Sequence, residues 1–150
     1  MMFLANLVGA ILMAVALLHL YWALGGLWPG KDEATLTRTV FGENDRTQMP
    51  DQNITAVVSG FIALAALWPL MWIGAYQPPL PGWLLGLGMI ALTVIFLGRG
   101  AAGYVPMVVN QHAEQPFASL NARYYSPLIV AIGVIMFILL LGGRNIAAGP

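Results

Sequence analysis

Four continuously apolar stretches, each about as long as a bilayer-spanning helix, constrain the fold of this chain more than any other feature. They cover about residues 2–24, 53–75, 80–98 and 124–141. A helix needs roughly 20 residues to cross a hydrocarbon core about 30 Å thick, and each stretch reaches that length within one turn. The strands of a membrane barrel would alternate apolar and polar residues, and a soluble bundle would show polar helix faces. Neither pattern is present, so we predict four helical spans.

The composition fits a chain whose surface lies against lipid. Of the 150 residues, 59% are hydrophobic and only 8% are charged, whereas about a quarter of a soluble domain is charged. The main partner of the chain is therefore the lipid bilayer. We predict an all-α fold in one domain, residues 1–150. This is an integral membrane bundle of four transmembrane helices, with one long charged loop and one shorter loop on the same face.

The charge balance and the lack of cysteine exclude several classes of function. Six basic and six acidic residues cancel, so no basic field is available to bind nucleic acid. Without cysteine the chain has no disulfide, no thiol redox pair and no thiolate metal site. No HxxxH or ExxH spacing occurs, so the sequence predicts no metal centre of the usual helical kind.

Segment 25–52 joins the first two spans and carries eight of the twelve charged residues. Its opening letters, GGLWPG, end the first helix because glycine loosens the backbone and proline removes a donor. A short interfacial helix follows over residues 31–41, and we expect its lipid-facing side chains to be Leu36, Val40 and Phe41. A side-chain oxygen of Asp51 or Gln52 then caps the second span.

The even number of spans places segments 25–52 and 99–123 on one side of the membrane and both termini on the other. The two segments contain five basic residues, while the terminal side has only Arg144; the five are Lys31, Arg38, Arg46, Arg99 and Arg123. Because basic residues near span ends stay inside, we predict that both segments are cytoplasmic and that the termini face out.

Polar and aromatic side chains gather where the first and third spans end and the fourth begins, all at one membrane face. Polar residues at membrane depth are costly and therefore functional suspects. We predict a shallow polar cup at this face. The sequence assigns no catalytic residue in it; the candidate ligand-binding or functional residues are His19, Tyr21, Trp22, Arg99, Tyr104, His112, Asn121, Tyr125 and Ser126.

His19 precedes Trp22 by three residues, so the two side chains share a helix face. An imidazole there can accept a proton, ligate a metal or haem, or bond a quinone oxygen. The alternative is a histidine near the interface that bonds a loop carbonyl. His19 and His112 could in principle ligate haem from both sides, but the sequence identifies no cofactor.

Arg99 follows a whole uncharged span. Either its guanidinium holds a carboxylate or phosphate inside the bundle, or its side chain reaches out to lipid phosphates. The aromatic residues of this face are more typical of an interfacial belt than of a cofactor site. Ser126 and Pro127 are typical of a helix start, where the missing proline N–H costs little.

Two blocks of the sequence, HLYWALGGLWPG at residues 19–30 and RG followed by PFASLNARYYSPL within residues 99–128, resemble the bacterial DUF3995 family of small four-span membrane proteins. The resemblance covers nearly the whole chain. It implies four membrane helices and a bacterial inner membrane, and names no activity. The positions that match are His19, Tyr21, Trp22, Gly25, Gly26, Arg99, Phe117, Tyr125, Ser126, Pro127 and Leu128.

The resemblance also argues against acid–base catalysis in this chain. The family pattern usually has an aspartate before the Tyr-Ser-Pro stretch, where this chain has Asn121. If that aspartate acts as a general base in the family, an amide cannot replace it.

These observations leave three hypotheses for function. The first is a non-enzymatic component: an accessory subunit, joined to a membrane protein partner or a second copy, or a protein that binds a lipophilic ligand. Glycines along the third span favour close helix contacts of this kind. The second is an enzyme that acts on a lipophilic substrate through His19, Arg99 and Tyr125. The third is a small oligomeric transporter, which the lack of charges within the spans disfavours.

Overall fold

A computed structural model of the chain describes residues 1–42, 48–105 and 115–143, and the regular elements in this part of the chain are all helical. Four of its helices are long and apolar enough to cross a membrane. They are α1 (Met2–Ala23), α3 (Gln52–Trp72), α4 (Gly82–Ala102) and a final helix made of α5 (Phe117–Leu120), the π-helical turn η2 (Asn121–Tyr125) and α6 (Ser126–Gly142). The chain is thus an all-α membrane protein, as predicted.

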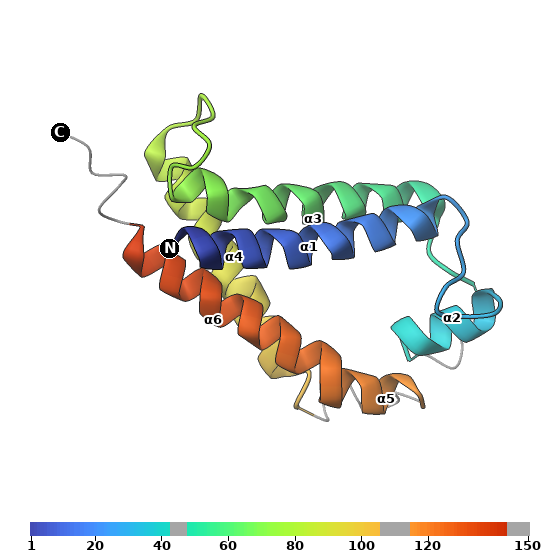
Figure 1. Cartoon of the computed structure of the whole chain (residues 1–150). Helices are drawn as coiled ribbons and strands as arrows, with labels where there is room; N and C mark the ends of the chain where they lie inside the picture. The colour runs from blue at the N-terminus through green and yellow to red at the C-terminus, as the bar shows by residue number, and fades with distance from the viewer. Residues whose placement is uncertain (43–47, 106–114, 144–150) are drawn as a thin grey trace.

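The long helices form two pairs, α1 with α3 and α4 with α6 (Figure 1). Glycine and small polar residues bring the helices of each pair together. In the first pair, the Ser59 hydroxyl donates to the carbonyl oxygen of Ala16 at 2.7 Å. In the second, Gly100 lies so close to α6 that a Cβ there would be 2.9 Å from the backbone nitrogen of Val130. Small residues at such contacts are what lets membrane helices pack closely.

The two pairs pack against each other near the chain termini. There the buried core joins Val8 and Leu12 of α1 to Met136 and Leu139 of α6. The Trp72 indole N–H of α3 adds a hydrogen bond to the carbonyl oxygen of Leu139 at 2.9 Å. Burial of these side chains and this bond hold the pairs together at the terminal end.

Toward the opposite end the pairs diverge, and the short helix α2 (Glu33–Val40) lies between the end of α1 and α3 and the helix α5 (Figure 1). The expectation that Leu36 of α2 faces lipid was wrong, because this side chain is fully buried. The neighbouring Gly30 explains the difference: a Cβ there would lie 2.8 Å from the Cβ of Leu36. Only glycine allows α2 to fold back this closely on the chain that leads into it.

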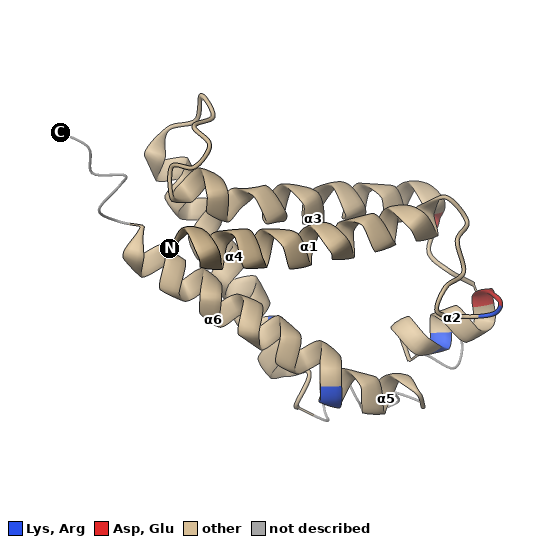
Figure 2. Ribbon diagram, viewed as in Figure 1, with Lys and Arg blue, Asp and Glu red and all other residues tan. Residues whose placement is uncertain are grey.

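Charged side chains of the described residues lie at the end of the bundle away from the termini, on α2 and at the ends of the long helices (Figure 2). Helix α3 has a side-chain cap at its N-terminus. Asp51 accepts from the backbone N–H of Asn53 at 2.8 Å, which confirms the predicted cap of α3.

The final helix begins seven residues earlier than predicted, at Phe117 rather than at 124, and residues 117–123 are not a loop. Pro127 lies in the first turn of α6, as predicted, but α6 directly continues the π-helical turn, so the proline lies within the span Phe117–Gly142. Proline cannot donate to the carbonyl four residues back and its ring crowds that carbonyl. The wider π-turn directly before it, Asn121–Tyr125, accommodates this defect.

Candidate functional site

The structure places the candidate residues in two separate groups at the diverging end. The first, the His19 group, consists of His19, Tyr21, Trp22 and Trp28 at the end of α1. The second, the Asn121 group, consists of Gly103, Asn121 and Ser126, where α4 meets the π-turn. Among the described residues, no hydrogen bond, ion pair or ring contact joins the two groups.

The turn after α1 fixes the first group. The backbone N–H of Gly26 donates to the Tyr21 carbonyl and that of Gly25 to the Trp22 carbonyl, which is the Schellman arrangement. Gly25 has φ +88°, and the Tyr21 ring covers Gly26 where a Cβ would stand. The two adjacent glycines thus end the helix and seat the tyrosine ring.

His19 is held in one orientation by its own helix. Its Nδ1 lies 2.8 Å from the carbonyl oxygen of Val15. A carbonyl accepts only, so Nδ1 carries the proton, and in the neutral ring Nε2 then has a free lone pair. Among the described residues Nε2 has no hydrogen-bond partner. The ring also lies 5.0 Å from the Trp22 ring, centre to centre.

His19 occupies the side of α1 that faces the protein. The residues Leu12, Ala16 and Ala23 are fully or nearly buried. His19 lies three residues after Ala16 and four before Ala23. These positions share one helix face. His19 itself is half-buried. An ionisable ring thus stands where the preceding turns of α1 carry core residues.

The segment after α1 folds back over the first group. The Trp22 indole N–H donates to the carbonyl oxygen of Trp28 at 2.7 Å. This bond fixes the Trp22 ring beside His19 and uses its only donor.

The second group is buried and hydrogen-bonded within itself. The Asn121 side-chain amide donates to the carbonyl oxygen of Gly103 at 3.1 Å, and the Ser126 hydroxyl donates to Asn121 Oδ1 at 3.2 Å. Both side chains have no solvent exposure. A Cβ at Gly103 would overlap the Ser126 hydroxyl. The three residues therefore act as a structural joint between α4 and the final helix.

Tyr125 lies beside this joint and connects it to α2. Its ring centre is 6.1 Å from that of Phe117, and Phe117 packs on Gly42, which has φ +71° just after α2. Tyr125 is half-buried. The sequence motifs did not point to Gly42, because the signal there is only the absence of a side chain. Gly103 is one of the glycines that the sequence offers for close helix contacts, and it makes one with Ser126.

Arg99 and Tyr104 lie at the end of α4 and are exposed. Within the described residues Arg99 has no ion-pair partner. The cup residue His112 lies outside the described residues, so the haem hypothesis that joins it to His19 stays a prediction.

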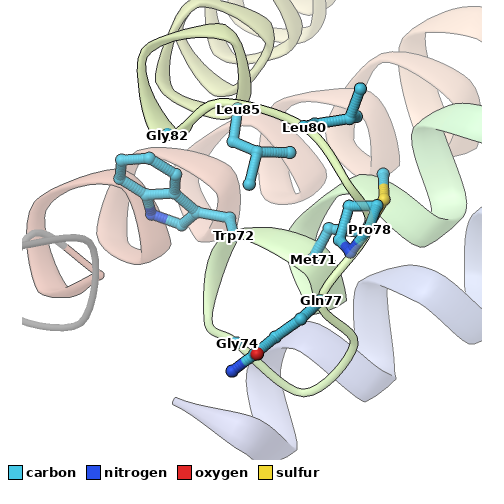
Figure 3. Close-up of a pocket in the computed structure, with 8 residues that line it drawn as sticks. All are labelled: Met71, Trp72, Gly74, Gln77, Pro78, Leu80, Gly82 and Leu85. Carbon is cyan, nitrogen blue, oxygen red and sulfur yellow. The ribbon is translucent and has the colours of Figure 1, made fainter. Parts of the chain in front are cut away.

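A pocket of about 270 Å³ lies at the other end of the bundle, around the α3–α4 turn (Figure 3). It was not predicted from the sequence. Of its two N–H-bearing side chains, Trp72 already donates to Leu139 and Gln77 is exposed. The lining residues are Met71, Trp72, Gly74, Gln77, Pro78, Leu80, Gly82 and Leu85.

Comparison with known proteins gives a family. Residues 12–136 match the family model described as "Protein of unknown function (DUF3995)". No curated protein and no solved structure matches the chain. Because the matched residues make up most of the chain, it belongs to the DUF3995 family.

Proposed function

We propose that this member of the DUF3995 family is a non-enzymatic membrane protein that binds a lipophilic ligand between its two helix pairs, at the end where they diverge. The carrying observation is His19, a half-buried histidine on the α1 face that carries Leu12 and Ala16, whose Nε2 has no hydrogen-bond partner among the described residues. Ionisable groups at membrane depth are costly and mark sites of function by default.

The position of His19 along α1 supports a ligand site at the end where the helix pairs diverge. The last buried α1 residue in the cluster that joins the two pairs is Leu12, and His19 lies two turns, or about 10 Å, further along the helix. On the opposite pair the core begins at Ile132. At this level Ala16 of α1 contacts Ser59 of α3, and Gly100 of α4 contacts Val130 of α6, so each contact joins helices of the same pair. His19 thus lies beyond that cluster, on the α1 face that carries Leu12 and Ala16.

The placement of α2 favours a ligand that enters from the lipid. The buried core joins the pairs at the terminal end, and α2 lies at the diverging end (Figure 1). An approach from the side passes only through bilayer. A molecule that takes that path is itself lipophilic.

The chemistry of the second group favours binding over catalysis. Asn121 and Ser126 are buried and bonded to each other, so neither presents a free group to a substrate. The acids of the described residues, Asp32, Glu33 and Asp51, lie outside the four spans. An enzyme that uses His19, Arg99 and Tyr125 would need all three to reach one reacting atom.

We place the protein in the bacterial inner membrane, with segments 25–52 and 99–123 cytoplasmic. The excess of basic residues in these segments supports this orientation. The proposed ligand then lies in the cytoplasmic half of the bilayer.

Native mass spectrometry of protein extracted gently from its own host membrane tests the function. We expect a reproducible small-molecule mass on the wild type that is lost in His19→Ala and kept in Tyr21→Phe. Tyr21 is the matched control because it lies on the exposed side of the same turn. An additional protein mass instead would identify an accessory subunit. A bare wild-type monomer in every preparation would refute ligand binding.

A further inference from the structure

We infer that the ligand carries a hydroxyl that donates a hydrogen bond to Nε2 of His19, so that it belongs to the lipophilic alcohols or phenols. This inference rests on the proposed function and names the chemical class that the site accepts. It follows from which donors and acceptors of the His19 group are already in use.

The first step is the direction of the hydrogen bond at His19. The Val15 carbonyl oxygen accepts the Nδ1 proton at 2.8 Å. In the neutral imidazole the other nitrogen is then an acceptor. A ligand that forms a hydrogen bond with Nε2 must supply the proton, which a hydroxyl does and a ketone, ester or ether does not.

The second step is that the Trp22 indole N–H, the donor of the ring beside His19, is already in use. The Trp22 indole N–H is bonded to the Trp28 carbonyl. Tyr21 lies against Gly26 on the exposed side of the helix. A ligand head that only accepts hydrogen bonds therefore cannot use the Trp22 indole N–H, the ring donor beside His19.

The third step concerns charge. Helix α1 carries no charged side chain, and the nearest along the chain is Lys31, beyond the turn. The exposed basic residues Arg99 and Arg123 belong to the other pair. An anionic phosphate head would lie beside the His19 ring without a Lys or Arg side chain in the His19 group. A neutral hydroxyl fits this environment better.

The fourth step concerns the Trp22 ring, which lies beside His19. The Trp22 ring is tilted by 57° to the imidazole, with ring centres 5.0 Å apart, and its hydrogen bond to Trp28 holds it there. An apolar chain or ring that follows the hydroxyl can pack on this indole face. Polar head and apolar body then have adjacent partners.

Nitrogen NMR of the histidine rings in detergent micelles tests the acceptor directly. The chain has two histidines, so the full-length His112→Gln variant leaves one ring to observe. We expect a protonated Nδ1 and an unprotonated Nε2 in the free protein. Addition of 1-dodecanol should shift the Nε2 resonance saturably. A free-state spectrum with the proton on Nε2 would overturn the inference.

A matched pair of probes separates this inference from the proposed function. We expect dodecanol to bind about tenfold more tightly than dodecyl methyl ether, since the ether leaves Nε2 without a donor. Native mass spectrometry at graded probe concentrations should show that His19→Ala abolishes this ratio and that Tyr21→Phe keeps it. Each probe partitions into detergent to the same extent with every variant. This partition therefore cancels when the alcohol-to-ether binding ratios of two variants are compared.

Equal saturable binding of both probes would overturn the hydroxyl inference and leave the proposed function standing. Absence of saturable binding for both would count against the proposed function itself. A preference for the alcohol that survives in His19→Ala would place the acceptor at another residue and overturn the assignment to Nε2.

Discussion

The side-chain amide of Asn121 donates a hydrogen bond to the carbonyl oxygen of Gly103, 3.1 Å away, and joins the end of α4 to the start of the final helix. Carbonyls in the last turn of a helix have no partner within that helix. In lipid such a group finds no water either, so a partner from another segment is required. Asn121 supplies this partner, and the Ser126 hydroxyl holds the amide in place because it donates to Asn121 Oδ1.

Replacement of this amide should destabilise the bundle. Asn121→Ala leaves the Gly103 carbonyl and the Ser126 hydroxyl unbonded in a buried site. We expect the free energy of unfolding to fall by about 1–3 kcal/mol, the cost of buried polar groups without partners. Reversible unfolding in mixed micelles measures this change.

The single variant Ser126→Ala provides the comparison. It removes only the donor to Asn121 Oδ1 and leaves the bond to Gly103, so its loss should be smaller. The double variant should lose less than the sum of the two, because the residues share one network. Additive losses would show that Asn121 and Ser126 act independently.

Two glycines on α4 should respond in opposite ways to alanine. At Gly98 an added Cβ meets no atom within 4 Å, so Gly98→Ala should stabilise by up to about 1 kcal/mol through helix propensity. At Gly100 the Cβ would press on the backbone of Val130, so Gly100→Ala should destabilise by about 1–3 kcal/mol. Thermal unfolding of both variants in one detergent checks the signs. Equal shifts would contradict the α4–α6 contact.

The spans could be predicted from the sequence because length and hydropathy alone decide whether a helix crosses lipid. The start of the last span could not. Residues 117–123 are polar enough to read as a loop, and Pro127 is typical of a helix start. What makes them helical is tertiary: Asn121 reaches Gly103, 18 residues back, and the π-turn absorbs the proline.

The cap of α2 should titrate below the usual range of a carboxyl group. The Asp32 carboxylate accepts from the backbone N–H of Thr35 at 2.7 Å and from its hydroxyl at 2.8 Å. The backbone bond first, and then the hydroxyl bond, hold the pKa of Asp32 below its usual 3.8. The contribution of this cap to α2 is therefore present above that value and is lost as pH falls through the lower, folded-state pKa.

We expect the Thr35 amide resonance to move on acidification with a midpoint below 3.8, as followed by NMR in micelles. Asparagine caps a helix about as well as aspartate and does not titrate, so Asp32→Asn should lack this transition. A midpoint at or above the usual value would show that the carboxylate does not hold this cap in solution.

The candidate residues could be named from the sequence, but which of them contact one another could not be predicted. The sequence places His19 and Asn121 at the same membrane face, and helix length suffices for that. Which of them shares hydrogen bonds depends on how the pairs diverge and on Gly42 and Gly103, whose missing side chains permit the contacts. Two residues at the same depth in the membrane can still lie far apart in the membrane plane.

The orientation of the chain can be measured without removing any native cysteine, since it has none. Lys31→Cys places a thiol just before α2, and Gln77→Cys places one in the α3–α4 turn at the other end of the bundle. Both side chains are exposed.

In intact cells we expect a membrane-impermeant maleimide to label Gln77→Cys and to leave Lys31→Cys unlabelled until the membrane is opened. The basic residues near the span ends on the Lys31 side are the physical reason, because such residues are retained in the cytoplasm. The unmodified chain, which has no thiol, controls for background. The reverse pattern would place segment 25–52 outside, since the acids of that segment would then have outweighed its basic residues. It would also move the proposed ligand to the outer half of the bilayer.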